Sequence, residues 1–334
     1  MYHGHSYIHF ITTIFSRSSS YKHCIIFRPH DYFPLQCGTS YLMRYLERGE
    51  ELYLNDHELC TLTFNDPTRL VKMYHGLDRI TADGQRRIKV GLKCPKDSES
   101  DWGLQHYSTY WPNTDFIVTM RHPVWWFQSF YNYRSYQHYP RRMHDPLDLI
   151  GPCRDDHPGQ ICAHKVSPKD ECTSQNVCTD RSNFHYPLSR LQKTPMNTTR
   201  ELELLAGRTM DTMSGLKGRV FLMEVGYLGL EGAEQAQFIR DLSNYLGMEK
   251  PLPPFPPHTR EFKYEVEERR QDFIDICDSK FIPVRAELIK GGKATSEWLR
   301  DYFLKSDEVI VSQRHIFLEL ISKWSIDPCE NVEA

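Results

Sequence analysis

The chain has 334 residues, a formal net charge of −3, 25% charged residues and 40% hydrophobic residues. This balance is ordinary for a globular protein and gives enough material for one large α/β domain or two modest ones. The net charge argues against nucleic-acid binding through overall charge. No apolar run of about 18 residues predicts a transmembrane helix, so a membrane anchor is not visible in the sequence.

The N-terminal segment, residues 1–22, is expected to be irregular, with a loop at residues 18–20. Residues 7–15 are too few and too polar to span a membrane. They also make a poor signal peptide, because they lack a basic leader and a small-residue cleavage site. A first strand is predicted over residues 24–27, where Ile and Phe follow Cys24.

A turn of small residues follows that predicted strand and precedes a helix expected over residues 41–46. Its members are Gln36, Cys37, Gly38, Thr39 and Ser40. Such a turn directs backbone N–H groups at an anion, and the helix N-terminus adds partial positive charge. The alternative is an ordinary strand-to-helix turn with a Ser or Thr cap. The turn does not follow the Walker pattern, which needs a lysine after the second glycine.

The centre of the chain predicts a second anion site. An apolar, β-branched run over residues 116–120 leads directly into Arg121, and a helix with aromatic residues at helical spacing follows Pro123. Ser129 lies about two turns into this helix. Ligands of open α/β folds bind outside the carboxyl ends of strands, and arginine offers a planar fork that matches phosphate. The alternative is a buried strand that ends in a surface arginine.

Another short strand is predicted over residues 88–92, followed by Lys93-Cys94-Pro95, and a helix over residues 103–111. The C-terminal half predicts further elements in chain order, namely a helix over residues 199–207, a strand over 219–225, a helix over 236–246, an extended proline-rich connector over 251–257, and helices over 265–289 and 296–304. A polar tail is expected over residues 326–334.

Residues 140–187 form a long polar insertion with four cysteines, Cys153, Cys162, Cys172 and Cys178. No Cys-x-x-Cys pair is present, which argues against a zinc ribbon, and no metal is expected. Cysteines in a segment with little apolar content favour disulfides and an oxidising compartment over free thiols in a cytosolic loop. The sequon at Asn197 agrees with a secretory location.

Taken together, these motifs resemble the PAPS-dependent sulfotransferases, of the Golgi carbohydrate type more than the cytosolic type. The resemblance runs from about residue 25 to 250. Residues 37–40 resemble the loop that holds the 5′-phosphosulfate, and Arg121 and Ser129 resemble the pair that holds the 3′-phosphate of the nucleotide. Residues 93–95 resemble the Lys-x-Pro turn between the two sites, and residues 219–229 resemble a later strand that contains a glutamate.

The resemblance implies an α/β, three-layer sandwich around a central, mostly parallel sheet of the P-loop nucleotide-binding type, in a single domain over residues 23–325. It implies transfer of the sulfuryl group of 3′-phosphoadenosine 5′-phosphosulfate (PAPS) to a hydroxyl or amine of a glycan or similar acceptor in the Golgi lumen. Positioning and charge stabilisation should dominate such a transfer, as they do in phosphoryl transfer.

Two positions depart from the family pattern. Gln36 occupies the place of the usual loop lysine, so either activity is reduced or Lys93 or Lys22 substitutes for it. Leu92 occupies the place of a glutamate that often serves as the base. The nearby candidates for the base are Asp97, Glu99 and His106, each of which is also compatible with a solvated surface residue.

Three alternatives to an active sulfotransferase follow. One is a catalytically impaired relative that still binds the nucleotide, which is suggested by Gln36. Another is a P-loop kinase or NTPase, although the absent Walker lysine and the lack of an evident acidic Mg²⁺ ligand after a strand count against it. The third is a disulfide-linked adhesion domain without catalysis, in which the two anion sites would be coincidental.

Overall fold

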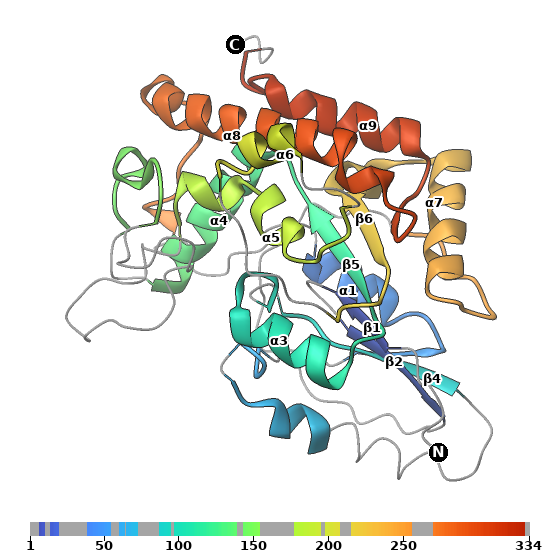
Figure 1. Cartoon of the computed structure of the whole chain (residues 1–334). Coiled ribbons are helices and arrows are strands. Elements are labelled where there is room, and N and C mark those ends of the chain that lie inside the picture. Colours follow the sequence, from blue (N-terminus) through green and yellow to red (C-terminus); the bar gives the residue numbers. More distant parts are fainter. Residues whose placement is uncertain are drawn as a thin grey trace.

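The computed structural model of this chain describes residues 7–10, 14–19, 39–54, 60–63, 65–72, 87–94, 97–138, 143–153, 177–194, 198–207, 215–255 and 270–330. Helices and strands combine in these ranges into a mixed α/β protein (Figure 1). The strands belong to one seven-stranded sheet, and its elements are β1 (Tyr7–Phe10), β2 (Ile14–Ser19), β3 (Leu52–Leu54), β4 (Arg87–Gly91), β5 (Thr114–Met120), β6 (Val220–Glu224) and β7 (Val309–Val311).

The strand order across the sheet is β3-β4-β2-β1-β5-β6-β7. Strand β2 is antiparallel to both of its neighbours, and the other four pairings are parallel. All strands except β2 therefore run in the same direction, and their carboxyl ends point toward one edge of the sheet. The prediction of an α/β protein with a mostly parallel sheet agrees with this arrangement.

The described α-helices include α1 (Thr39–Leu46), α3 (Asp101–Tyr110), α4 (Pro123–His138), α5 (His185–Ser189), α6 (Thr199–Leu204), α7 (Gly232–Tyr245), α8 (Ile282–Asp301) and α9 (Arg314–Ser322), and residues 67–72 are helical as well. Short 3₁₀ turns connect them, namely η1 (Asp97–Glu99), η2 (Pro146–Leu149), η3 (Thr179–Ser182), η4 (Val225–Gly229), η6 (Ser279–Phe281), η7 (Phe303–Lys305) and η8 (Lys323–Ser325).

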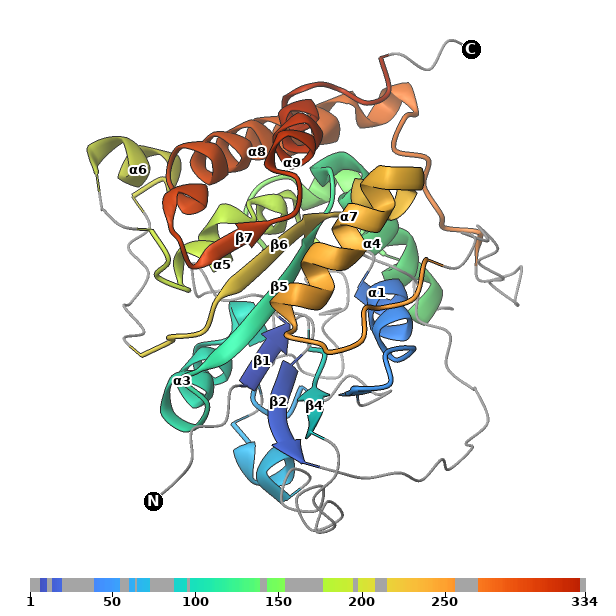
Figure 2. The same cartoon turned by 90° about the vertical axis from the view of Figure 1, so that its right-hand side faces the viewer.

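Strands β5 and β6 lie side by side in the sheet, and every residue of both strands is buried. Their register pairs Ile117 with Phe221, so Phe116 and Phe221 project from opposite faces. Tyr107 of α3 packs on Phe116 with ring centres 5.8 Å apart, and Phe238 of α7 packs on Phe221 at 6.1 Å. Helices therefore cover both faces of the sheet, and Figure 2 shows α7 running alongside β5 and β6.

Several predicted elements are confirmed with small changes at their ends. These are the strands now seen as β4, β5 and β6 and the helices now seen as α1, α3, α4, α6 and α7. The strand predicted over residues 24–27 lies outside the described residues, as does the connector beyond residue 255.

The expectation of an irregular segment over residues 1–22 is wrong for Tyr7–Phe10 and Ile14–Ser19, which form β1 and β2. Strand β1 pairs with β5 through Tyr7–Thr114 to Phe10–Ile117, and β2 pairs with β4. Strands this short depend on partner strands far away in the sequence, so local residue preference gives little signal for them.

The C-terminal helices differ from the prediction in two ways. Residues 271–278 are not helical, and α8 begins at Ile282, where Pro283 favours a helix start. The helix then continues through Gly291 and Gly292 instead of breaking. A Cβ on Gly292 would lie 2.6 Å from the carbonyl oxygen of Trp324 and 3.1 Å from Pro123. The glycine is thus needed for close packing of α8 against the start of α4 and against η8.

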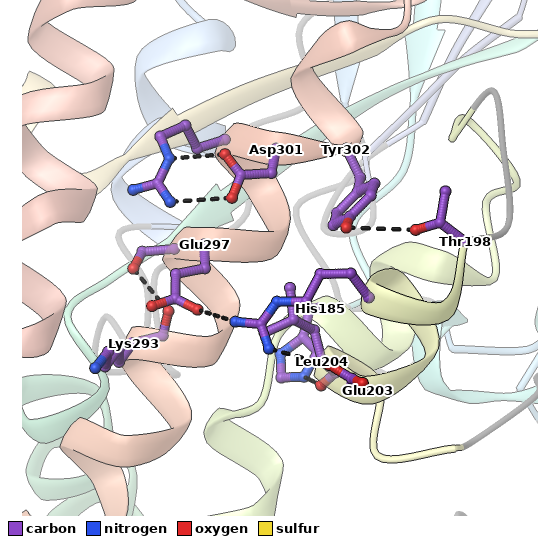
Figure 3. A network of polar contacts seen from close by, with 11 residues as sticks. His185, Thr198, Glu203, Leu204, Lys293, Glu297, Asp301 and Tyr302 are labelled. Carbon is purple, nitrogen blue, oxygen red and sulfur yellow. Dashed lines mark hydrogen bonds and ion pairs between the residues drawn. The ribbon is translucent and has the colours of Figure 1, made fainter.

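Helix α6 is fixed to α8 by polar contacts, which Figure 3 shows from close by. Arg200 bridges Glu203 and Glu297 at 3.2 Å each, and the hydroxyl of Thr198 lies 3.4 Å from that of Tyr302. Thr198 also caps α6, because its hydroxyl accepts a hydrogen bond from the backbone N–H of the third helical residue. The middle residue of the predicted sequon is therefore a helix cap, whereas Asn197 lies outside the described residues.

Candidate functional site

Three strand ends at one edge of the sheet carry charged residues. Lys93 follows β4, Arg121 follows β5, and Glu224 is the last residue of β6. The three strands run in the same direction, so these residues lie at the edge where open α/β folds bind ligands. Strands β2 and β1 lie between β4 and β5. The registers of β4, β2, β1 and β5 place Val90 in one row with Thr114, so the end of β4 is level with the start of β5. The ends of β4 and β5 are therefore separated by three strand spacings, roughly 14 Å, across the sheet and by five residues, roughly 17 Å, along the strands.

The turn between β5 and α4 is held by the imidazole of His122, which is 8% exposed. Its Nε2 lies 3.0 Å from the carbonyl oxygen of Lys323 and 3.3 Å from that of Ile326, while its Nδ1 accepts a hydrogen bond from the backbone N–H of Val124. These contacts fit a neutral ring with its hydrogen on Nε2. Burial lowers the pKa of His122, and the two carbonyls oppose this shift. The ring thereby fixes the backbone immediately after Arg121.

Glu224 approaches the same turn from β6. One carboxylate oxygen accepts a hydrogen bond from the backbone N–H of His122 at 3.2 Å, and the other accepts one from the backbone N–H of Gly226. Burial raises the pKa of Glu224, and the charges of Arg121 and Lys323 act in the opposite direction. The sequence predicts this strand, but no role for its carboxylate was expected. The available signal was a glutamate at the end of a wholly apolar strand.

Ser129 lies on α4, and its side chain and that of Arg121 are both half-buried. Six residues separate Ser129 from the first residue of α4, which corresponds to about 9 Å along the helix axis. The structure thus places the predicted pair on one strand–turn–helix unit, with Arg121 at its corner and Ser129 on its helix. A guanidinium and a hydroxyl are donors suited to a phosphate group.

The turn after β4 is held differently. Lys93 is 2% exposed, and the next residue, Cys94, forms a disulfide with Cys60. Asp97 begins η1 in the same turn and is 1% exposed. Its carboxylate accepts hydrogen bonds from the hydroxyls of Thr63, at 2.6 Å, and Tyr107. Burial raises the pKa of Asp97 to about 6, against the effect of both hydroxyls.

The other two base candidates are engaged elsewhere. Glu99 forms an ion pair with Arg181 at 2.8 Å, and the guanidinium of Arg181 lies 4.8 Å from the ring centre of Phe130. His106 contacts Asn65 at 2.9 Å and stacks between two aromatic rings of α3. Burial lowers the pKa of His106. Asp97 is therefore the candidate that shares a hydrogen-bonded turn with Lys93.

The predicted phosphosulfate loop is only partly visible. Gln36, Cys37 and Gly38 lie outside the described residues, and Thr39 and Ser40 are seen only as the first residues of α1. The helix itself is confirmed. Its apolar face is buried, and the hydroxyl of Tyr45 donates to the carbonyl oxygen of Pro253 at 2.7 Å.

Three disulfides join described residues. Cys153–Cys178 confirms one pair within the insertion, whereas Cys162 and Cys172 lie outside the described residues. Cys60–Cys94 and Cys277–Cys329 were not predicted. The second of these connects the segment before α8 to the expected polar tail. Disulfides are typical of proteins from oxidising compartments.

Among the described residues, no group of three or more His, Cys, Asp or Glu side chains is arranged to hold a metal ion. No helix in the described ranges is long and apolar enough to cross a membrane.

Comparisons with models of protein families, with curated proteins and with solved structures found no match to this chain. The case for a function therefore depends on the residues at the carboxyl edge of the sheet.

Proposed function

We propose that this protein is a sulfotransferase that moves the sulfuryl group of PAPS to a hydroxyl or amine of a glycan or similar acceptor. The observation that carries the proposal is the position of Arg121 and Lys93 after β5 and β4, two strands whose carboxyl ends lie at the same edge of the sheet. Helices on both faces of that sheet support a three-layer arrangement of the P-loop type.

The donors at this edge suit a nucleotide with two separate anionic groups. In the proposal, Arg121 and Ser129 hold the 3′-phosphate, and the turn of residues 36–40 with Lys93 holds the 5′-phosphosulfate. The two strand ends are offset both across the sheet and along the strands, which keeps the two binding points distinct. Charge at each point is supplied by a residue type that binds phosphate well, a planar guanidinium and a compact ammonium.

In the proposed transfer, the bond between sulfur and the 5′-phosphate oxygen breaks, and a bond forms between sulfur and the acceptor oxygen or nitrogen. The electron pair of the broken bond stays on the phosphate oxygen, where Lys93 stabilises the charge. The proton of the acceptor goes to a base. Asp97 is the best supported base, because burial raises its pKa to about 6 and it shares the turn of Lys93.

A second candidate is a protein that binds the nucleotide without efficient transfer. Gln36 favours it, since the amide at the position of the usual loop lysine forms hydrogen bonds but carries no charge. Both candidates place the protein in an oxidising compartment, which the three disulfides support. We assign the Golgi lumen specifically on the family resemblance.

Calorimetric titration of adenosine 3′,5′-bisphosphate tests the shared part of both candidates. Wild-type protein should bind it more tightly than ATP, and Arg121→Ala should weaken binding about 10- to 100-fold, as expected for a hydrogen-bonded charge pair. Arg240→Ala, which removes an exposed arginine on α7, is the control and should bind like wild type. Absence of bisphosphate binding by the wild type would refute the proposal, and a preference for ATP would favour a kinase.

Transfer of radiolabelled sulfate from PAPS to a panel of glycans separates the two candidates. Wild-type activity supports the sulfotransferase. Binding without transfer, followed by transfer in Gln36→Lys, would assign the defect to the loop position and favour the impaired relative.

A further inference from the structure

The backbone at Arg121 is fixed by contacts from three directions. The residue before it, Met120, pairs with Glu224 in the β5–β6 ladder. The residue after it, His122, donates its backbone N–H to the Glu224 carboxylate, and its ring is held by carbonyl oxygens in and after η8. Glu224 therefore contacts the chain on both sides of Arg121, once through its backbone and once through its side chain.

We propose that Glu224 is the positioning residue of the phosphate site, because its carboxylate holds the Arg121–His122 turn in the conformation in which Arg121 meets a 3′-phosphate. This inference rests on the nucleotide site proposed above. Glu224 itself is 6% exposed, and it acts on the ligand through Arg121. A hydrogen bond to a charged acceptor is stronger than one between neutral groups, so this contact resists displacement of the turn.

Gly226 makes this contact possible. The Glu224 carboxylate folds back onto the backbone N–H of Gly226, and a Cβ at that position would lie 2.7 Å from the Glu224 Oε2 and 2.6 Å from Leu320. A larger residue would push the carboxylate away from its place. Gly229 in the same 3₁₀ turn has no atom within 4 Å of an added Cβ. The two glycines therefore form a matched pair for substitution, because a Cβ at Gly226 would displace the Glu224 carboxylate and a Cβ at Gly229 would not.

A double-mutant cycle tests whether Glu224 acts through Arg121. Glu224→Gln keeps one acceptor oxygen and should weaken binding of adenosine 3′,5′-bisphosphate about 10-fold or more in the wild-type background. In the Arg121→Ala background the same change should have an effect of less than twofold, because the residue to be positioned is gone. Equal effects in both backgrounds would overturn the inference. The proposed nucleotide site fails separately, if the wild type does not bind or Arg121→Ala binds like wild type.

Ligand discrimination distinguishes positioning from general loss of structure. The ratio of the dissociation constants of adenosine 5′-monophosphate and adenosine 3′,5′-bisphosphate reports contact with the 3′-phosphate alone. Gly226→Ala should lower this ratio about 10-fold while binding of the monophosphate changes little, and Gly229→Ala should leave the ratio unchanged. An equal loss for both nucleotides, or equal behaviour of the two glycine variants, would contradict the assignment. If Glu224→Gln does not fold, the comparison of Gly226→Ala with Gly229→Ala still tests the proposal.

Discussion

The turns that follow β5 and β4 lie at the same edge of the sheet but are held by different chemistry. In the β5 turn, the His122 ring is hydrogen-bonded to a backbone carbonyl oxygen, and the buried Glu224 carboxylate accepts a hydrogen bond from the backbone N–H of His122. The β4 turn is fixed by a disulfide and by a buried aspartate, Asp97, that accepts two hydroxyl groups. One turn is therefore held partly by a covalent bond, and the other is held by hydrogen bonds. We expect the β4 turn to respond to loss of its disulfide, and both turns to respond to pH.

Among the changes considered, removal of the Cys60–Cys94 disulfide should cause the largest loss of stability. Replacing both cysteines with serine frees a loop whose ends are 34 residues apart and should lower the free energy of unfolding by about 4 kcal/mol, through the larger conformational freedom of the unfolded chain. Urea denaturation measures the loss. Replacing Cys277 and Cys329 is the matched control, with a separation of 52 residues and a similar expected loss. Only the first variant should impair the Lys93 turn, and equal sulfate transfer by both variants would argue against this.

The pH dependence of stability should distinguish the buried acids and bases of the two turns. The folded pKa of Asp97, about 6, is above its ordinary value of 3.8, so its contribution to stability is fully present below 3.8 and is lost as the pH rises through 6. The difference corresponds to about 3 kcal/mol. Denaturation at pH 4 and pH 8 should show that Asp97→Asn removes this dependence, whereas Asp66→Asn, at an exposed position, should retain it.

His122 should show the opposite sign. Its pKa is lowered by burial, so its contribution to stability is present above the ordinary value of 6.5 and is lost as the pH falls through the folded pKa. His122→Ala removes the ring contacts with η8 and with Val124 and should cost about 2 kcal/mol at neutral pH. Denaturation curves at neutral and acidic pH should converge for the two proteins as the pH falls. A constant difference would mean that the ring does not titrate between the folded and unfolded states.

The smallest effect concerns the link between the two turns. Glu99 in η1 pairs with Arg181, whose guanidinium lies over Phe130 of α4, so one arginine touches both regions. Glu99→Gln should lower the free energy of unfolding by about 1 kcal/mol, because the pair is partly exposed. Glu203→Gln, in an exposed pair on α6, should cost less. If Glu99→Gln lowers the free energy of unfolding no more than Glu203→Gln does, the Glu99–Arg181 pair does not stabilise the protein as a connection between the two regions.

The elements that the sequence predicted well are those whose signal is local. The apolar run of β5, the arginine that ends it and the proline that starts α4 are adjacent in the chain, and the aromatic spacing of α4 follows at once. Strand β6 and helix α7 have equally regular patterns. The pairing of β1 with β5 could not be predicted in this way, because the partners are about one hundred residues apart.

The residues of the candidate site also differ in whether their signal in the sequence is local or long-range. Arg121 and Ser129 were proposed from neighbouring residues, Lys93 from the family resemblance, and Asp97 as one of three candidate bases. The carboxylate of Glu224 was not assigned a role, because its partner His122 is 102 residues away. The disulfides of Cys94 and Cys329 were also missed, since the pairing of cysteines depends on which segments the fold brings together.

By itself, the sequence determined which residue types end each strand and begin each helix, because capping, periodicity and proline act over a few residues. Only the tertiary structure decided which strand ends meet and what holds them there. A sheet joins strands through hydrogen bonds between segments that are distant in the chain. Polar groups that become buried near the strand ends then form hydrogen bonds with the turns. The position of Arg121 at a strand end can thus be predicted from neighbouring residues, whereas the contacts of Glu224 and His122 that hold its turn depend on the fold.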